Sequence, residues 1–106
     1  MLLRLPEQTL RFFRSQGVMI FEKLPDAFGA AEVDGEIVLI SASTGEFFAI
    51  KGAGVEIWRE LDQSGNVDDI VTSLTRTFAV DELSARSEVS DFLGELERLG
   101  FVRRGG

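Results

Sequence analysis

The sequence predicts an α+β domain in which a three-stranded antiparallel sheet is followed by three helices. Two changes of pattern along the chain support this prediction. From residue 27 to residue 50 the apolar residues follow the period of strands, and an Asp34-Gly35 pair divides the stretch. After Gly52 the apolar residues recur every three or four positions as far as Leu99, which is the period of helices. We therefore expect the helices to gather on one side of a small sheet.

The predicted strands are joined by two tight turns. Asp34-Gly35 suits the positive backbone angles of a two-residue hairpin turn, and Ser43-Thr44-Gly45 marks the second turn. We expect strands over residues 28–33, 36–41 and 46–50, arranged as a meander. A sheet of this size leaves an edge strand unpaired.

The third predicted strand contains two neighbouring phenylalanines. Side chains alternate between the two faces of a strand, so Phe47 and Phe48 must point to opposite faces. If Phe48 joins Ile50 in the core, Phe47 and Ala49 face outward. An outward aromatic residue on an edge strand is either a shielded surface residue or a binding feature. The sequence does not fix which peptide groups of this strand point to its open side.

Each predicted helix combines an end signal with an apolar stripe. Asn66 and Asp81 are candidate N-caps of the second and third helices. Gly100 stands where a left-handed residue ends a helix, and Phe101 can then close over Leu96 in a Schellman motif. The three apolar stripes are Ile57, Trp58 and Leu61; Val67, Ile70, Val71, Leu74 and Phe78; and Val89, Phe92, Leu93, Leu96 and Leu99.

Both ends of the chain are predicted to lie outside the packed part. Residues 1–24 hold four basic and two acidic residues, whereas residues 25–106 carry a net charge of −9 within the total of −7. Pro6 can open a short helix or arm that Gly17 ends. We therefore divide the chain into an extension, 1–24, which the function should not require, and a domain, 25–106. The final Arg103-Arg104-Gly105-Gly106 is expected to be a loose terminus.

The composition excludes several kinds of chemistry. The chain has 106 residues and neither cysteine nor histidine, which removes disulfides, thiolate ligands and the commonest general base. Its net charge of −7 should repel a nucleic-acid backbone. No apolar run is long enough to span a membrane, and charged residues interrupt any signal-peptide core. We expect a cytoplasmic protein that is not an enzyme and uses neither a cofactor nor a metal.

Three local groupings have ordinary structural explanations. A dinucleotide-binding fingerprint would need a third glycine where Ile57 stands, so Gly52-Ala53-Gly54 is better explained as a flexible lead-in to a helix. A carboxylate-metal enzyme would need paired acids, but neighbours such as Asp68 and Asp69 do not share a helix face and favour a solvated surface. Trp58 lies on an apolar stripe, which favours a core position over ligand stacking.

Five segments together resemble the PqqD-like family. They follow one another in the family's order and spacing and cover about residues 25–102. The resemblance is carried by their order and spacing together and by no single segment. The segments are VDGEIVLI at 33–40, TGEFFAI at 44–50, IWREL at 57–61, VDDIV at 67–71 and FLGELERLGFV at 92–102.

The resemblance implies a winged-helix-like fold and a non-catalytic binding function. Members of the family act as recognition elements for ribosomally synthesised and post-translationally modified peptides (RiPPs). They hold the leader segment of a precursor peptide for a separate modifying enzyme, such as a radical SAM enzyme or a lasso-type leader peptidase. No membrane or nucleic acid is implied as a partner.

In that family the leader adds as a further strand along the third strand and lies against the third helix, here residues 47–50 and about 84–99. The sequence departs from the family's pattern in two places: Phe47-Phe48 replaces a frequent tyrosine pair, and Lys51 stands where asparagine is usual. The first departure preserves stacking but loses hydroxyl contacts that bear on the leader's fine specificity. The peptide-binding residues that the resemblance implies are Phe47, Phe48, Ala49, Ile50, Val89, Phe92, Leu93 and Leu96.

The alternative function is that of a winged-helix DNA-binding regulator, because the same order of elements can serve it. Its recognition helix would be expected to carry lysine or arginine toward phosphates. Acidic residues outnumber basic ones in the third helix, which argues against this alternative. The residues concerned are Glu82, Glu88, Asp91, Glu95 and Glu97 against Arg86 and Arg98.

Overall fold

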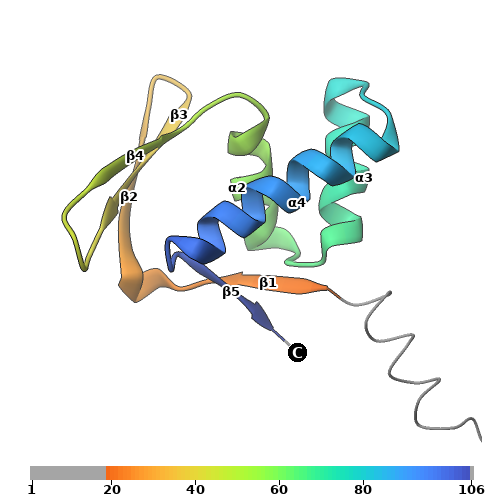
Figure 1. Cartoon of the computed structure of the whole chain (residues 1–106). Helices are drawn as coiled ribbons and strands as arrows, with labels where there is room; N and C mark the ends of the chain where they lie inside the picture. Colours follow the sequence, from red (N-terminus) through yellow and green to blue (C-terminus); the bar gives the residue numbers. More distant parts are fainter. Residues whose placement is uncertain (1–18, 106) are drawn as a thin grey trace, which may run out of the picture.

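The structure is a computed structural model that describes residues 19–105. The helix predicted to begin at Pro6 lies outside the described residues. The elements are β1 (Ile20–Lys23), the short 3₁₀ helix η1 (Pro25–Ala27), β2 (Phe28–Val33), β3 (Glu36–Ser41), β4 (Phe47–Ile50), α2 (Ala53–Gln63), α3 (Val67–Phe78), α4 (Glu82–Arg98) and β5 (Val102–Gly105). The sheet of β2, β3 and β4 lies on one side of the three helices, and β1 with β5 forms a separate ribbon (Figure 1). The predicted α+β architecture is confirmed.

The three-stranded sheet forms as the turn residues predict. Asp34 and Gly35 both have positive φ, 52° and 79°, as the two central residues of a type I′ hairpin turn require. The pairing of Val33 with Glu36 directly flanks this turn. Strand β4 continues the meander antiparallel to β3. The strand bounds match the predicted ones, apart from one residue at the start of β4.

The starts of α3 and α4 and the end of α4 lie at the predicted residues. The side chain of Asn66 accepts hydrogen bonds from two backbone N–H groups at the start of α3, and Asp81 caps α4 by accepting from the N–H of Ser84. Gly100 has φ 82°. Its N–H donates to the carbonyl of Glu97, and that of Phe101 donates to the carbonyl of Leu96. These two bonds are the Schellman motif expected there.

An aromatic cluster joins the sheet to the helices. Phe28 of β2 lies edge to face with Trp58 of α2, with ring centroids 5.1 Å apart, and with Phe101 at 5.7 Å. Trp58 is 5% exposed, so its predicted core position is confirmed. Phe78 differs from the prediction: it ends the stripe of α3 but is 44% exposed, because the helix stops there and the chain turns away through the left-handed residue Ala79.

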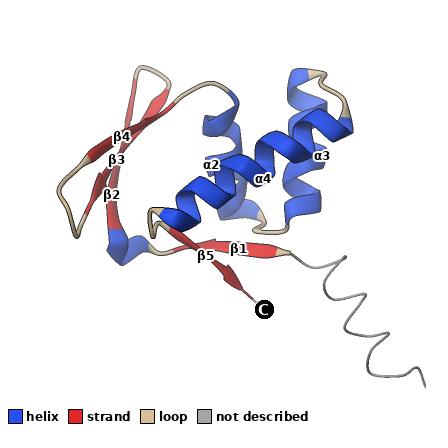
Figure 2. Ribbon diagram, viewed as in Figure 1, coloured by secondary structure: helices blue, strands red, loops and turns tan. Residues whose placement is uncertain are grey.

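The C-terminal residues do not form a loose terminus, and that prediction was wrong. Val102–Gly105 is strand β5, which pairs antiparallel with β1, and the two strands cross near the C-terminal end of α4 (Figure 2). Arg103 forms an ion pair with Glu22 across the ribbon. The strands pair because the Schellman motif turns the chain back as α4 ends.

Strand β1 packs as part of the domain although it lies within the predicted extension. Phe21 is 3% exposed and belongs to the core. The N–H of Phe21 donates to the carbonyl of Gly65, where a side chain would collide with the β1 backbone. Lys23 lies 3.9 Å from the Trp58 ring centroid and forms an ion pair with Asp62. The predicted boundary after residue 24 therefore separates β1 from the strands and helices that it packs against.

Candidate functional site

Strand β4 is one edge of the three-stranded sheet, whose order is β2-β3-β4. Its side chains alternate as the sequence predicted. Phe47 is 71% exposed and Ala49 is exposed, whereas Phe48 is half-buried and Ile50 is only 5% exposed. Phe48 and Ile50 therefore face the helices, and Phe47 and Ala49 face outward.

The hydrogen-bond pattern of β4, which the sequence left open, follows from the register. The N–H of Ser41 donates to the carbonyl of Glu46 at 2.9 Å, which makes Ser41 and Glu46 a hydrogen-bonded pair of the antiparallel ladder. Hydrogen-bonded and non-hydrogen-bonded pairs alternate along such a ladder. In the register that pairs Leu39 with Phe48, the peptide groups of Phe48 point toward β3.

The same alternation directs the peptide groups of Phe47 and Ala49 away from β3, to the open side of β4. Their partners on β3, Ile40 and Val38, form non-hydrogen-bonded pairs with them. The other side of β3 agrees, because the bond from the N–H of Ala42 to the carbonyl of Ala27 directs the peptide groups of Ile40 and Val38 toward β2. The open edge of β4 therefore presents the N–H and C=O groups of Phe47 and Ala49.

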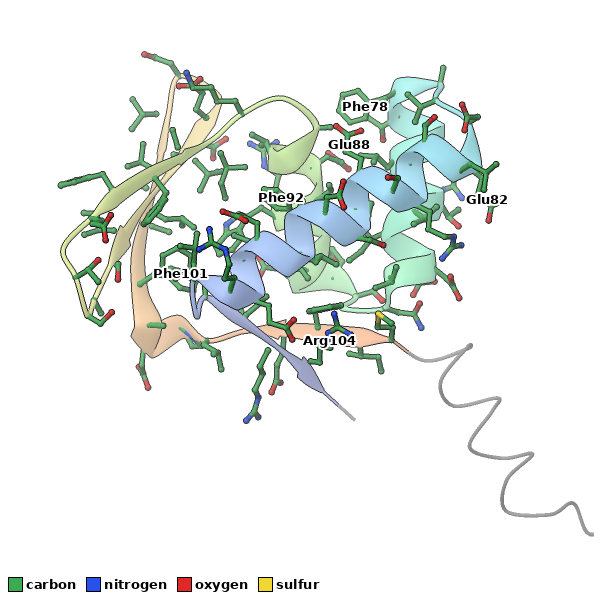
Figure 3. All side chains as sticks on the ribbon, in the orientation of Figure 1. Phe78, Glu82, Glu88, Phe92, Phe101 and Arg104 are labelled. Atoms are coloured by element: carbon green, nitrogen blue, oxygen red, sulfur yellow. The ribbon has the colours of Figure 1, made fainter. Side chains whose placement is uncertain are left out.

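Helix α4 and the end of β4 both approach Gly54 of α2, at a place that we call the β4–α4 junction and define by Ile50, Gly54 and Phe92. A Cβ atom built on Gly54 would lie 3.0 Å from Cγ2 of Ile50 and 3.1 Å from Cε2 of Phe92. Phe92 is half-buried against the core and projects from α4 toward the sheet (Figure 3). The junction thus places an aromatic ring near the last residue of the edge strand β4.

The predicted site residues on α4 do not all reach the surface. Val89 and Leu93 are fully buried and Leu96 is 4% exposed. These three belong to the core that holds α4 in place. Of the four α4 residues predicted to bind peptide, Phe92 alone is partly exposed, and it lies at the same junction as Ile50.

The sequence reasoning missed Gly54. It interpreted the glycine as a flexible lead-in to α2, whereas the structure places it against Ile50 and Phe92. The available signal was a second glycine two residues after Gly52, at a position that the structure places within α2, where glycine is unfavourable unless close packing requires it.

The basic side chains of α4 are engaged in ion pairs. Arg86 lies 2.9 Å from Asp68 and also contacts Glu82, and the hydrogen bond to Asp68 raises the pKa of its guanidinium. Arg98 hydrogen-bonds to Glu95 and holds the pKa of that carboxyl below its usual range. Neither arginine is free to meet a phosphate backbone without giving up a carboxylate partner.

Other candidate sites in the described part of the chain are weaker. Within residues 19–105 no three side chains of histidine, cysteine, aspartate or glutamate are grouped so that they could hold a metal ion. None of the described helices has both the length and the apolar character needed to cross a membrane. A shallow cavity of about 280 Å³ lies over α3 and the start of α4, lined by Val71, Thr72, Thr75, Val80 and Glu82.

Comparison with known proteins identifies the family. The family model for coenzyme PQQ synthesis protein D (PqqD) matches residues 36–102. One similar solved structure is TbiB1 in complex with the TbiA(beta) leader peptide, with 28% identity, a TM-score of 0.70 and coverage of 76% of this chain and 94% of that chain. No curated protein matches the chain.

A second solved structure shares the fold. It is lasso peptide synthetase B1 complexed with the leader peptide, with 23% identity, a TM-score of 0.66 and coverage of 78% of this chain and 96% of that chain. The family match spans well over half of the sequence and includes β3, β4 and all three helices. The chain belongs to the PqqD family.

Proposed function

We propose that this protein is a non-catalytic RiPP recognition element that binds the leader segment of a precursor peptide by strand addition along β4. The observation that carries the proposal is the open edge of β4, where Phe47 and Ala49 present their peptide groups, with the Phe92 ring near the Ile50 end of the strand. The likeness to TbiB1, solved with a leader peptide, supports the same assignment.

An added strand would be bound from its backbone and from both of its faces. Peptide residues opposite Phe47 and Ala49 would exchange backbone hydrogen bonds with them and place their side chains on the outer face. Peptide residues opposite Phe48 and Ile50 would point toward the helices, where Phe92 lies. Alternate peptide residues are therefore selected by different surfaces.

The expected affinity is modest. The N–H and C=O groups of Phe47 and Ala49 offer four ladder bonds, worth roughly 1 kcal/mol each. One or two apolar anchors add about 2 kcal/mol each. After the cost of ordering an extended peptide, a dissociation constant from micromolar to high nanomolar is expected.

Such a complex would serve a second protein. The described residues offer a binding edge, and the chain lacks histidine and cysteine, which removes the commonest general base and any thiol nucleophile. We propose that the bound leader is presented to a separate modifying enzyme, either a radical SAM enzyme or a lasso-type leader peptidase.

Amide hydrogen exchange on the full chain tests this function. The probes are the TbiA(beta) leader peptide and the tightest binder from a displayed library of random peptides of about 12 residues. Binding should slow exchange at the amides of Phe47 and Ala49. The amides of Phe48 and Ile50 should change little, because they already donate to β3. A bound peptide that protects neither Phe47 nor Ala49 would contradict strand addition.

Retention on duplex DNA serves as the control for the regulator alternative. The ion pairs of Arg86 and Arg98, together with the net charge of −7, favour no retention at any salt concentration. Retention that weakens steeply as salt rises would favour DNA binding instead.

A further inference from the structure

Glycine occupies two positions at the start of α2, and each has a different structural explanation. Gly52 has φ +57°, a conformation that side chains disfavour, and it turns the chain from β4 into the helix. Gly54 has no such backbone requirement and lies within the helix, where alanine is ordinarily preferred. Glycine is required at position 54 by close packing, because a Cβ atom there would lie 3.0 Å from Ile50 and 3.1 Å from Phe92.

The two neighbours of Gly54 differ in their freedom to move. Ordinary contacts between carbon atoms lie near 3.5–4.0 Å, so both neighbours of a methyl group at this position would have to give by a few tenths of an ångström. Ile50 is 5% exposed and is held in the core. Phe92 is half-buried, and the atoms nearest to Gly54 are at the far end of its ring. The Phe92 ring would therefore move more than Ile50, toward its exposed side.

An outward Phe92 ring would enter the space that a bound peptide needs. In strand addition along β4, the peptide residue opposite Ile50 forms a non-hydrogen-bonded pair with it, with Cβ atoms about 4.5–5.5 Å apart. Its side chain points toward the helices, as that of Ile50 does. We therefore expect it to approach the Phe92 ring, which lies with Ile50 beside Gly54.

We propose that Gly54 sets the size of the side chain that a bound peptide places opposite Ile50. The proposal rests on the proposed function and adds a specificity determinant to it. With no side chain at Gly54, the Phe92 ring stays close to α2 and leaves room for a large apolar residue such as leucine or phenylalanine. A side chain at position 54 pushes the ring toward the peptide and disfavours the largest residues at this subsite.

The test measures binding of one peptide series to the full chain and its variants. The tightest binder from the random library supplies the parent peptide, and its residue opposite Ile50 is changed to alanine, valine, leucine or phenylalanine. The wild-type chain should prefer the two largest residues. Gly54→Ala should weaken binding of the leucine and phenylalanine peptides at least about tenfold and that of the alanine peptide less than about threefold.

Gly94→Ala is the matched control. It makes the same change within a helix, on α4 itself, but a Cβ atom there meets nothing within 4 Å. It should keep the wild-type order of affinities. Thermal unfolding of each variant gives the folded fraction at the temperature of the binding measurement.

A second variant tests the proposed cause. Phe92→Leu combined with Gly54→Ala shortens the displaced side chain and should restore binding of the two large peptides to within about threefold of wild type. If Gly54→Ala does not fold, Phe92→Leu alone remains decisive, because it should raise affinity for the phenylalanine peptide relative to the leucine peptide.

Two results would overturn the proposal. Gly54→Ala could keep the wild-type order, or it could weaken all four peptides equally. A wild-type chain that captures no peptide from the library would instead overturn the proposed function, and this inference with it.

Discussion

The rings of Phe48 and Phe101 meet edge to face with their centroids 5.6 Å apart. Phe48 belongs to the edge strand β4, and Phe101 is the residue that closes the Schellman motif after α4. Phe101 is 1% exposed and also contacts the ring of Phe28. One aromatic residue thus ties two strands of the sheet to the end of α4, which holds β4 in place while its outer edge stays open.

Phe101→Ala should destabilise the domain by about 3–5 kcal/mol, because it removes a fully buried ring and leaves a cavity between sheet and helices. Denaturant unfolding followed by the fluorescence of Trp58 measures this free energy. Phe101→Leu should cost clearly less, since it keeps most of the buried volume. Equal losses for the two variants would show that the cavity is not the cause.

Removal of residues 1–18 should leave both stability and peptide binding unchanged, because β1 begins at Ile20. A chain that starts at Leu24 should lose about 3–5 kcal/mol of stability, since it lacks the buried ring of Phe21 and the partner of β5. Thermal and denaturant unfolding of the two truncated chains check this. A tenfold loss of affinity in the shorter truncation, about 1.4 kcal/mol, would place residues 1–18 in the binding site.

Phe92→Ala should weaken peptide binding at least about tenfold and cost roughly 1–3 kcal/mol of stability, because its ring is half-buried. Val89→Ala is the contrast, since Val89 is fully buried one turn earlier on α4. It should reduce stability but leave the affinity of the folded fraction unchanged. Calorimetric titration at a temperature where both variants are folded separates the two effects. Normal affinity in Phe92→Ala would remove the ring from the site.

Asp81→Asn should lower the unfolding temperature at neutral pH and have little effect in acid. Hydrogen bonds from the backbone and side chain of Ser84 lower the pKa of Asp81 in the folded protein. The carboxylate therefore stabilises the fold above its unfolded pKa, and this contribution is lost as the pH falls through the folded value, below about pH 4. Unfolding temperatures of the variant and the wild type from pH 3 to pH 7 measure the difference. A constant difference over this range would contradict the assignment.

The elements predicted from the sequence are those with local signals. Asp34-Gly35 specifies a turn by itself, and Asn66, Asp81 and Gly100 mark helix ends within a few residues of the groups that they bond. Strands β1 and β5 carry no such signal. Each has four residues, and their pairing joins positions about 80 residues apart, such as Phe21 and Arg104.

In the candidate site, too, the features with a local sequence signal were predicted and those that depend on distant residues were not. Alternation along β4 was sufficient to assign Phe47 and Phe48 to opposite faces. The hydrogen-bond pattern of the strand depends on its register with β3, which a single strand sequence does not contain. The helical period predicted Phe92 and Val89 on one apolar stripe but could not distinguish the buried side of that stripe from the side next to β4.

Two proline substitutions on β4 test strand addition most directly. Proline removes one backbone donor and cannot join a ladder at that position. The N–H of Phe48 points toward β3, so Phe48→Pro should break the β3–β4 pairing and lower stability. The N–H of Ala49 points to the open side, so Ala49→Pro should leave the domain folded and remove a bond to the peptide. Ala49→Ser keeps the N–H and serves as the control.

The decisive measurement is the affinity of folded Ala49→Pro for the peptide selected by the wild-type chain, with thermal unfolding recorded alongside. We predict a wild-type unfolding temperature to within a few degrees and an affinity reduced at least about tenfold, with Ala49→Ser binding normally. A folded Ala49→Pro variant that binds the peptide as tightly as the wild type would contradict strand addition along β4.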